Sequence, residues 1–507
     1  MAHVVHNTPP AAPPRRRTNT TGRAVGAAPL PEDAAVPQAN RDSTASAPTQ
    51  QSDRTVLILA SRFPPVASVG SIRVRKFAKY LSLFGWRPVV LTGAMHTATA
   101  GAQDTRRATD IESLRDLPRG LPVYRLSPIV DDWHGHLSRR LSTALARATR
   151  PLSIDEGRWL GALGWRFQRL HDRLSFPDRG IWRLLPAVRL ALHLHKRYRF
   201  DAIFSSGMPF SDHLIAGVTQ TFLRRPWLAD FRDPWVEYIH WQQWQSERGR
   251  WLTEKTESAV VCRAARVISV NDHMTQRFAA RYPELRSNRF VTIPNGFDPT
   301  DFPAKRRPEP RTRFRLLYAG SLYGARSPKR VLQAFRQFLD AVPGSRRHAC
   351  FEFAGRPGSH ADGLNADGDP TVRYRGFLSH VAALRAMCRA DVNVVLLPNI
   401  PGSENDTTTK IYECLGSGRP ILAVLPPNGA AARVLDGADG VWQCNPDDTA
   451  AIARAIRDLY HQWLSGTLHV TRTPKFLQQY TRRHQTKRLG EYLDAVVSAR
   501  TRAAPTA

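Results

Sequence analysis

Short apolar runs alternate with amphipathic segments of helical length along most of the chain. The first run spans residues 55–60, a helical pattern then ends at Gly85, and a second apolar run follows at residues 89–91. A strand of a parallel sheet reads as a continuous apolar run because both of its faces are covered. Two such runs joined by one helix form a βαβ unit, so we expect a parallel sheet that begins near residue 55.

The same rhythm continues in two series, on either side of a charged, proline-rich stretch at residues 299–310. Further strands are expected at residues 201–204, 227–229, 266–270, 314–319, 350–354, 392–397 and 421–425. Helices are expected at residues 328–341, 410–415 and 478–497. Two βα series with a break between them predict an α/β protein with two doubly wound, Rossmann-like domains.

The length of 507 residues also favours two cores over one. Residues 1–52 are poor in large apolar side chains, so we expect them to form a disordered tail. The remaining boundaries are expected as a first domain over residues 53–300, a linker over 301–310, a second domain over 311–472, and a C-terminal helix with a frayed tail over 473–507.

The formal net charge of +30 predicts attraction to anionic partners. Residues 125–199 carry 15 Lys or Arg against 6 acids, and they contain two basic amphipathic helical patterns, at 159–170 and 182–195. Such helices can lie on the anionic inner face of a membrane. They can equally be helices packed on a core with an arginine-rich solvent face, and the sequence leaves both interpretations open.

The five cysteines are scattered and form no C-x-x-C motif, which argues against a disulfide framework or a zinc site. We see neither an apolar run long enough to span a membrane nor a secretory signal. We therefore expect a cytoplasmic protein, with peripheral attachment to the inner face of the cell membrane as an option.

Six segments along the chain carry a recognisable pattern. They are Phe63-Pro-Pro…Gly70-Ser-Ile-Arg73 with the helix Phe77–Leu81, Ser205–His213, Ala229–Trp235, Ile293–Asp298, Tyr318–Ser321, and Lys410–Glu413 with Gly418-Arg-Pro420. With these segments the chain resembles the retaining, family-4-like (group 1) glycosyltransferases of bacterial cell-surface polysaccharide synthesis. The resemblance implies the GT-B fold, with the active site in a cleft between two Rossmann-like domains. It also implies a nucleotide-sugar donor, a saccharide or lipid-linked acceptor, and no metal or other cofactor.

On the donor side, the resemblance implies that Gly70 lets the backbone approach the donor diphosphate at a helix start. It further implies that Arg326 and Lys329, at the start of the helix after strand 314–319, neutralise the diphosphate and stabilise the leaving group. The plainer alternatives are an ordinary turn glycine and a solvated helix start.

Glu413 matches the glutamate that accepts hydrogen bonds from the donor ribose, and Lys410 would face the phosphates or the sugar. A surface pair three residues apart on a helix is the plainer interpretation. Many relatives have a second glutamate where this chain has Asn405. Gly320 and Arg356, at the ends of two strands of the second domain, are implied to lie near the nucleotide.

On the acceptor side, Asp230, Arg232 and Asp233 follow the strand at 227–229, and Arg73 belongs to the first matching segment. Asp233 is our candidate for orienting or deprotonating the acceptor hydroxyl. An Asp–Arg pair that holds the loop is an equal alternative. His213 is a second candidate, although a lone histidine near a helix start is more often structural.

Asp367-Gly-Asp369 formally matches a D-x-D metal motif, but it lies in an acidic, glycine-rich stretch, so we expect no metal there. Two other functions stay open. One is a nucleotide-sugar epimerase of the same fold, and the other is a non-catalytic module that binds polysaccharide or polyanions. No sequence motif for specific nucleic-acid binding is present.

Overall fold

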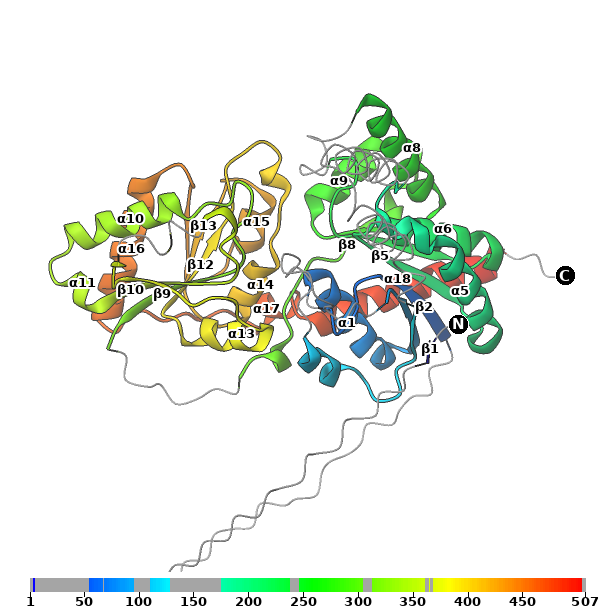
Figure 1. Cartoon of the computed structure of the whole chain (residues 1–507), viewed down its shortest axis with the longest axis horizontal. Coiled ribbons are helices and arrows are strands. Elements are labelled where there is room, and N and C mark those ends of the chain that lie inside the picture. The colour runs from blue at the N-terminus through cyan, green and yellow to red at the C-terminus, as the bar shows by residue number, and fades with distance from the viewer. Residues whose placement is uncertain are drawn as a thin grey trace, which may run out of the picture.

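A computed structural model describes residues 3–4, 54–66, 68–94, 110–127, 175–237, 246–303, 312–360, 364 and 368–503. Figure 1 shows two α/β domains side by side, the first coloured from blue to green and the second from yellow-green to orange. Most of the predicted tail, the linker residues 304–311 and Asp367 lie outside the described residues.

The first domain contains an eight-stranded sheet in the order β1-β4-β3-β2-β5-β6-β7-β8. Its strands are β1 (His3–Val4), β2 (Arg54–Leu59), β3 (Trp86–Thr92), β4 (Val123–Arg125), β5 (Ala202–Gly207), β6 (Trp227–Phe231), β7 (Arg266–Ser269) and β8 (Phe290–Thr292). All neighbouring strands are parallel except β1, which is antiparallel to β4. The predicted parallel sheet is confirmed. The expectation that the whole tail is disordered is wrong for His3 and Val4, because they pair with β4.

Strand β2 shows why its sequence is a continuous apolar run. Val56 and Ile58 face one core, and Leu57 and Leu59 face the other. Helix α1 (Val69–Tyr80) is capped at its N-terminus by Ser68, whose side chain accepts from the backbone N–H of Ser71. Among the described residues, the α-helices of this domain are α1, α5 (Leu184–Tyr198), α6 (Ser211–Leu223), α8 (Glu247–Arg263), α9 (Asp272–Arg281) and the returning α18 (Arg482–Ala503).

The second domain contains a six-stranded parallel sheet in the order β11-β10-β9-β12-β13-β14. Its strands are β9 (Phe314–Ala319), β10 (Ala349–Ala354), β11 (Val372–Tyr374), β12 (Val392–Leu396), β13 (Ile421–Val424) and β14 (Val441–Cys444). One face packs on α10 (Lys329–Ala341) and α16 (Thr449–Leu464), and the other on α13 (His380–Arg389), α14 (Thr409–Gly416) and α15 (Ala430–Leu435). Both domains thus have the doubly wound architecture that the pattern predicts.

The chain crosses between the domains twice. Before the linker, Phe297 is buried in the core of the second domain, and its N–H donates to Tyr480 O at 3.0 Å. After α17 (Pro474–Gln478), helix α18 returns to the first domain, where Leu489 and Leu493 pack beside Phe77 of α1. Figure 1 shows this red helix beside α1. The C-terminal helix therefore belongs structurally to the first domain.

Helix α5 is the longest helix in the described part of the basic region 125–199, which comprises residues 125–127 and 175–199. Its buried side chains, which include Val188 and Leu194, pack in the first core, whereas Leu185 of the predicted apolar stripe is 74% exposed. In α5 the packed-helix interpretation holds, because the apolar side packs on the sheet. The pattern at 159–170 lies outside the described residues. None of the described helices is long and apolar enough to cross a bilayer.

Candidate active site

Arg73 of α1 and Asp230 of β6 form a fully buried ion pair. Arg73 Nε and Nη2 donate to the two carboxylate oxygens at 3.1 and 2.8 Å, and both side chains are 0% exposed. The guanidinium also donates to the carbonyl oxygens of Ile293 and Pro294 at 2.8 Å, and Ser206 Oγ donates to Asp230 at 2.7 Å. Each polar atom of the pair therefore has a protein partner. The ion pair therefore ties α1 to β6 and to the segment after β8, and the predicted substrate contacts of Arg73 and Asp230 stay predictions.

Arg232 lies against the first turn of α1, where Gly70 stands. Its Nε donates to Gly207 O at 2.7 Å, and its Nη2 donates to Met208 O. A Cβ at residue 70 would lie 1.5 Å from Arg232 Nη1. Gly70 therefore permits the close approach of the Arg232 guanidinium, and its predicted contact with the donor diphosphate stays a prediction. A helix N-terminus beside a guanidinium attracts an anion from two directions.

We expect Gly70→Ala to displace the guanidinium of Arg232 and to lower kcat/KM for glycosyl transfer by about tenfold or more, because a misplaced active-site group is costly. Steady-state kinetics with circular dichroism as a folding check would measure this. Gly217→Ala is the matched control, since its Cβ would meet only Trp227 at 3.5 Å. Unchanged kinetics in the folded Gly70→Ala protein would show that the placement of Arg232 does not matter.

His213 is a buried, neutral side chain of α6. Its Nδ1 lies 2.8 Å from Ser205 Oγ, which also accepts from Trp227 Nε1 at 2.8 Å. Because the indole N–H can only donate to Oγ, the Ser205 hydroxyl can in turn donate to Nδ1 of a neutral imidazole. Burial lowers the pKa of His213 to about 3. A group that is neutral across the working pH range and stacked on Phe231 is suited to packing.

Asp233 is the half-buried carboxylate that follows Arg232 at the carboxyl end of β6. Burial lowers the pKa of Arg232, whereas the charges of Asp233 and Asp230 oppose that shift. Asp230 is paired with Arg73, whereas Asp233 lies at the carboxyl end of β6, and its role toward the acceptor hydroxyl stays a prediction.

Glu413 of α14 is the best-defined acidic group in the second domain. Its Oε2 lies 3.0 Å from Lys410 Nζ, and its Oε1 accepts from His380 Nε2 at 3.0 Å. The side chain is only 5% exposed. Burial alone would raise the pKa of Glu413, but the Lys410 charge and the His380 hydrogen bond outweigh it and lower the pKa. Glu413 is therefore an ionised carboxylate that acts only as an acceptor.

The loop after β9, which begins at Gly320, is held beside the loop after β10. Gly320 N donates to Ala354 O and Leu322 N donates to Arg356 O, both at 2.8 Å. Gly355 has a φ of 136°, and a Cβ there would lie 2.1 Å from Gly320 O. These contacts bring Gly320 and Arg356 to the carboxyl edge of the sheet, where the sequence predicts the nucleotide.

Arg326 and Lys329 follow this loop at the start of α10. The Arg326 guanidinium lies over the Tyr323 ring at 4.8 Å, and its buried Nε has no hydrogen-bond partner among the described residues. Lys329 is exposed at the first position of α10, whereas the adjacent Arg330 pairs with Asp447 at 3.3 Å. Both predicted cations therefore stand at the positive end of a helix.

The carboxyl edges of the two sheets face each other. Asn271, two residues after the end of β7, donates through Nδ2 to Asn405 O of the second domain at 2.9 Å. A small pocket lies between α1 and α14 and is lined by Lys76, His380, Glu413 and Arg482 among others. The candidate site is thus an interdomain one, because Glu413 of the second domain and Lys76 of α1 border the same pocket.

The sequence did not single out His380 or Arg482. Arg482 is 1% exposed, and its Nε and Nη2 lack hydrogen-bond partners among the described residues. Burial and the charge of Arg73 lower its pKa to about 9, against the opposing charge of Glu413. The sequence predicted only a basic helix near the C-terminus, and this pattern does not indicate that the start of the helix lies at the interdomain pocket.

A cluster of three carboxylates in the first domain resembles a metal site by ligand type. Asp116, Asp298 and Asp301 bring their oxygens within 4.8 Å of one another. However, Lys76 Nζ lies 2.6, 2.7 and 2.6 Å from these three carboxylates, and so occupies their centre. Asp369 of the D-x-D motif instead accepts hydrogen bonds from the N–H and the hydroxyl of Thr371.

Comparisons with known proteins identify the family and the fold of the two domains. Residues 313–462 match the family model described as glycosyl transferases group 1, and residues 143–301 match that of glycosyltransferase family 4. No curated protein matches the chain significantly.

Several solved structures are similar in fold to this chain over most of its length. HepE of Anabaena, in complex with UDP and glucose, has a TM-score of 0.54 at 13% identity, over 87% of this chain and 100% of its own. Sucrose-phosphate synthase of Thermosynechococcus elongatus has a TM-score of 0.55 at 16% identity, over 88% and 100%. The α,α-trehalose-phosphate synthase of Burkholderia xenovorans, in complex with glucose-6-phosphate, has a TM-score of 0.52 at 13% identity, over 87% and 100%.

Proposed function

We propose that this chain, a GT-B glycosyltransferase of the group 1 and family 4 type, transfers a sugar from a nucleotide-diphosphate sugar to a saccharide or lipid-linked acceptor. In this proposal the anomeric configuration is retained, and the product belongs to a cell-envelope polysaccharide or glycolipid. The protein works in the cytoplasm, with its basic first domain on the inner face of the membrane.

Glu413 carries the donor half of the proposal. Its carboxylate is ionised, oriented by Lys410 and His380, and placed beside the interdomain pocket. A carboxylate has about four acceptor positions, so two remain for the vicinal hydroxyls of a ribose. A site with an ionised, pre-oriented acceptor selects a ligand with paired hydroxyl donors.

The cations at the start of α10 support the diphosphate half. Arg326 can grip phosphate oxygens in a fork, Lys329 adds a point charge, and the α10 dipole favours the same anion. Together these groups would stabilise the negative charge that develops on the departing nucleoside diphosphate. We therefore propose a reaction that uses no metal.

The acceptor side of the proposal rests on Asp233 and Arg232. Asp233 stands at the carboxyl end of β6, where ligands of doubly wound domains bind. Its carboxylate would orient the acceptor hydroxyl, while Arg232, beside the α1 N-terminus, would hold an anionic group of the donor or the acceptor.

A nucleotide panel tests the proposal. Thermal unfolding would be followed with UDP, GDP, ADP, dTDP and CDP sugars, first without magnesium and then with it. We place UDP sugars first, because Anabaena HepE binds UDP. Ligand at a hundredfold excess over Kd stabilises the folded protein by about 2.7 kcal/mol. Stabilisation by one base without metal supports the proposal, and NMR of the anomeric proton of the product decides retention. A folded protein that responds to no nucleotide overturns it.

We expect Glu413→Gln to weaken binding of that nucleotide sugar by about 10- to 100-fold, because charge-assisted hydrogen bonds contribute roughly 1.5–3 kcal/mol. Isothermal titration calorimetry would measure the affinity. Glu491→Gln is the matched control, since Glu491 is 59% exposed and its ion pair among the described residues is an exposed one with Lys487 at 3.9 Å. Equal affinities for Glu413→Gln and the control would mean that Glu413 does not contact the ribose.

A further inference from the structure

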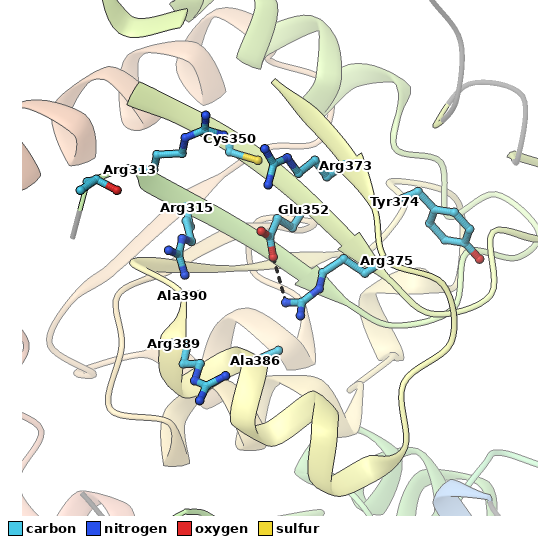
Figure 2. Close-up of a pocket in the computed structure, with 11 residues that line it drawn as sticks. Arg313, Arg315, Cys350, Glu352, Arg373, Tyr374, Arg375, Ala386, Arg389 and Ala390 are labelled. Carbon is cyan, nitrogen blue, oxygen red and sulfur yellow. Dashed lines mark hydrogen bonds and ion pairs between the residues drawn. The ribbon is translucent and has the colours of Figure 1, made fainter. Parts of the chain in front are cut away.

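A hollow lined by arginines lies on the second domain, away from the interdomain pocket. Its volume is about 740 Å³, within the range of sites that hold small molecules. Figure 2 shows the lining side chains, which come from β9, β10, β11 and the end of α13. The charged members are Arg313, Arg315, Glu352, Arg373, Arg375 and Arg389.

The position of this hollow follows from the alternation of side chains in the sheet. Leu317 and Ala319 of β9 are covered by the core that α13 and α14 complete. Arg315 points to the same side, two residues earlier, but is exposed. Beneath the last turn of α13 the lining residues are Ala386 and Ala390, whose small side chains leave the space open. The amino-terminal half of this sheet face is therefore a basic hollow instead of a packed interface.

The charges in the hollow are not balanced. Glu352 pairs with Arg375 at 3.0 Å, as the dashed line in Figure 2 marks. Within the described part of the chain, no carboxylate forms an ion pair with the other four arginines, and all four are exposed. The nearby Asp391 accepts from the backbone N–H of Arg315. Like charges on neighbouring strands repel each other, so this arrangement has an electrostatic cost unless an anion binds.

We propose that this hollow binds a ligand with two or more phosphate groups. Guanidinium groups bind phosphate oxygens in pairs, and arginines converging from β9, β11 and α13 suit several phosphates better than one. The concave shape favours a discrete headgroup or oligophosphate over a flat surface. Arg315 lies about five residues before the donor loop at Gly320, or roughly 16 Å along an extended strand, so the site is separate from the donor site.

Titration of the full chain with inorganic tripolyphosphate at about 0.15 M salt tests the proposal. We expect Arg315→Ala with Arg373→Ala to weaken binding by about tenfold or more. The matched control is Arg336→Ala with Arg454→Ala, which removes the same charge from exposed positions of α10 and α16, on the opposite face. The control should stay within about twofold of the wild type.

Three results would overturn the proposal. They are an absence of binding by the wild type, equal weakening in the two double variants, and complete loss of binding in Arg326→Ala. The last result would place the tripolyphosphate in the donor site. None of them depends on transferase activity, so this proposal and the proposed function can fail separately.

Vesicles distinguish the two sources of such a ligand. The wild type and the Arg315→Ala, Arg373→Ala variant would be sedimented with vesicles that contain cardiolipin, whose headgroup carries two phosphates, and with phosphatidylcholine vesicles. Loss of binding to the anionic vesicles in the variant supports a lipid headgroup as the ligand. Unchanged vesicle binding together with lost tripolyphosphate binding supports a soluble oligophosphate.

Discussion

Replacing Arg73 with methionine is expected to lower the free energy of unfolding by about 3–5 kcal/mol, because it leaves the buried carboxylate of Asp230 without its cation. The methionine preserves most of the side-chain volume, so the loss is electrostatic. The guanidinium also satisfies the carbonyls of Ile293 and Pro294. An unpaired buried acceptor adds to the cost.

Urea unfolding followed by tryptophan fluorescence would measure this effect. The double variant Arg73→Met with Asp230→Leu should recover part of the stability, since it removes the orphaned charge as well. Arg54→Met is the matched control, because its pair with Asp494 is 44% and 45% exposed and should contribute less than about 1 kcal/mol. A stable Arg73→Met protein with lost substrate affinity would instead make Arg73 a substrate ligand, as the sequence analysis expects.

The two sheets could be predicted because central parallel strands are apolar on both faces. The predicted range 314–319 coincides with β9, and the predicted helix at 328–341 differs from α10 by one residue. The short strands β4, β8, β11 and β14 were not predicted. They lie toward the edges of the sheets, where half-exposed residues such as those of β11 break the apolar run.

The candidate site could be predicted only where its residues share a local pattern. Lys410 and Glu413 lie three residues apart on one helix, so their contact could be predicted from their spacing in the sequence. The pairing of Arg73 with Asp230 joins residues 157 positions apart, and no local pattern distinguishes it from two separate substrate contacts. Arg482 could not be predicted either, because no local pattern shows that α18 returns to the first domain and brings Arg482 to the interdomain pocket.

Lys76 shows how the fold fixes the chain where it leaves the first domain. Its side chain is fully buried on α1, among Asp116, Asp298 and Asp301. Asp298 directly follows Phe297, which is already in the second core. The Lys76 cluster, defined as these four residues, therefore holds the crossing point between the domains, and its rigidity sets how the donor wall faces the acceptor wall.

We expect Lys76→Met to be destabilised by about 3–5 kcal/mol near neutral pH, because three carboxylates then share one buried space without their central cation. Burial alone would raise the pKa of Asp298, but the Lys76 charge outweighs it and lowers the pKa. In the wild type this depressed pKa adds stability above the unfolded pKa of about 3.9, which is lost as the pH falls through the folded value.

In Lys76→Met the charge that most lowers the pKa of Asp298 is gone, so its carboxyl should protonate at a higher pH than in the wild type. The stability difference between the two proteins should therefore be largest near pH 7 and shrink as the pH falls toward 4.5 or so, because protonation relieves the repulsion. Urea unfolding at both pH values would show this. Lys79→Met is the control: Lys79 contacts Asp116 and Asp298 but is 20% exposed, so its loss should have a smaller effect. A Lys76→Met deficit of equal size at both pH values would show that the lysine stabilises the crossing by packing and not by its charge.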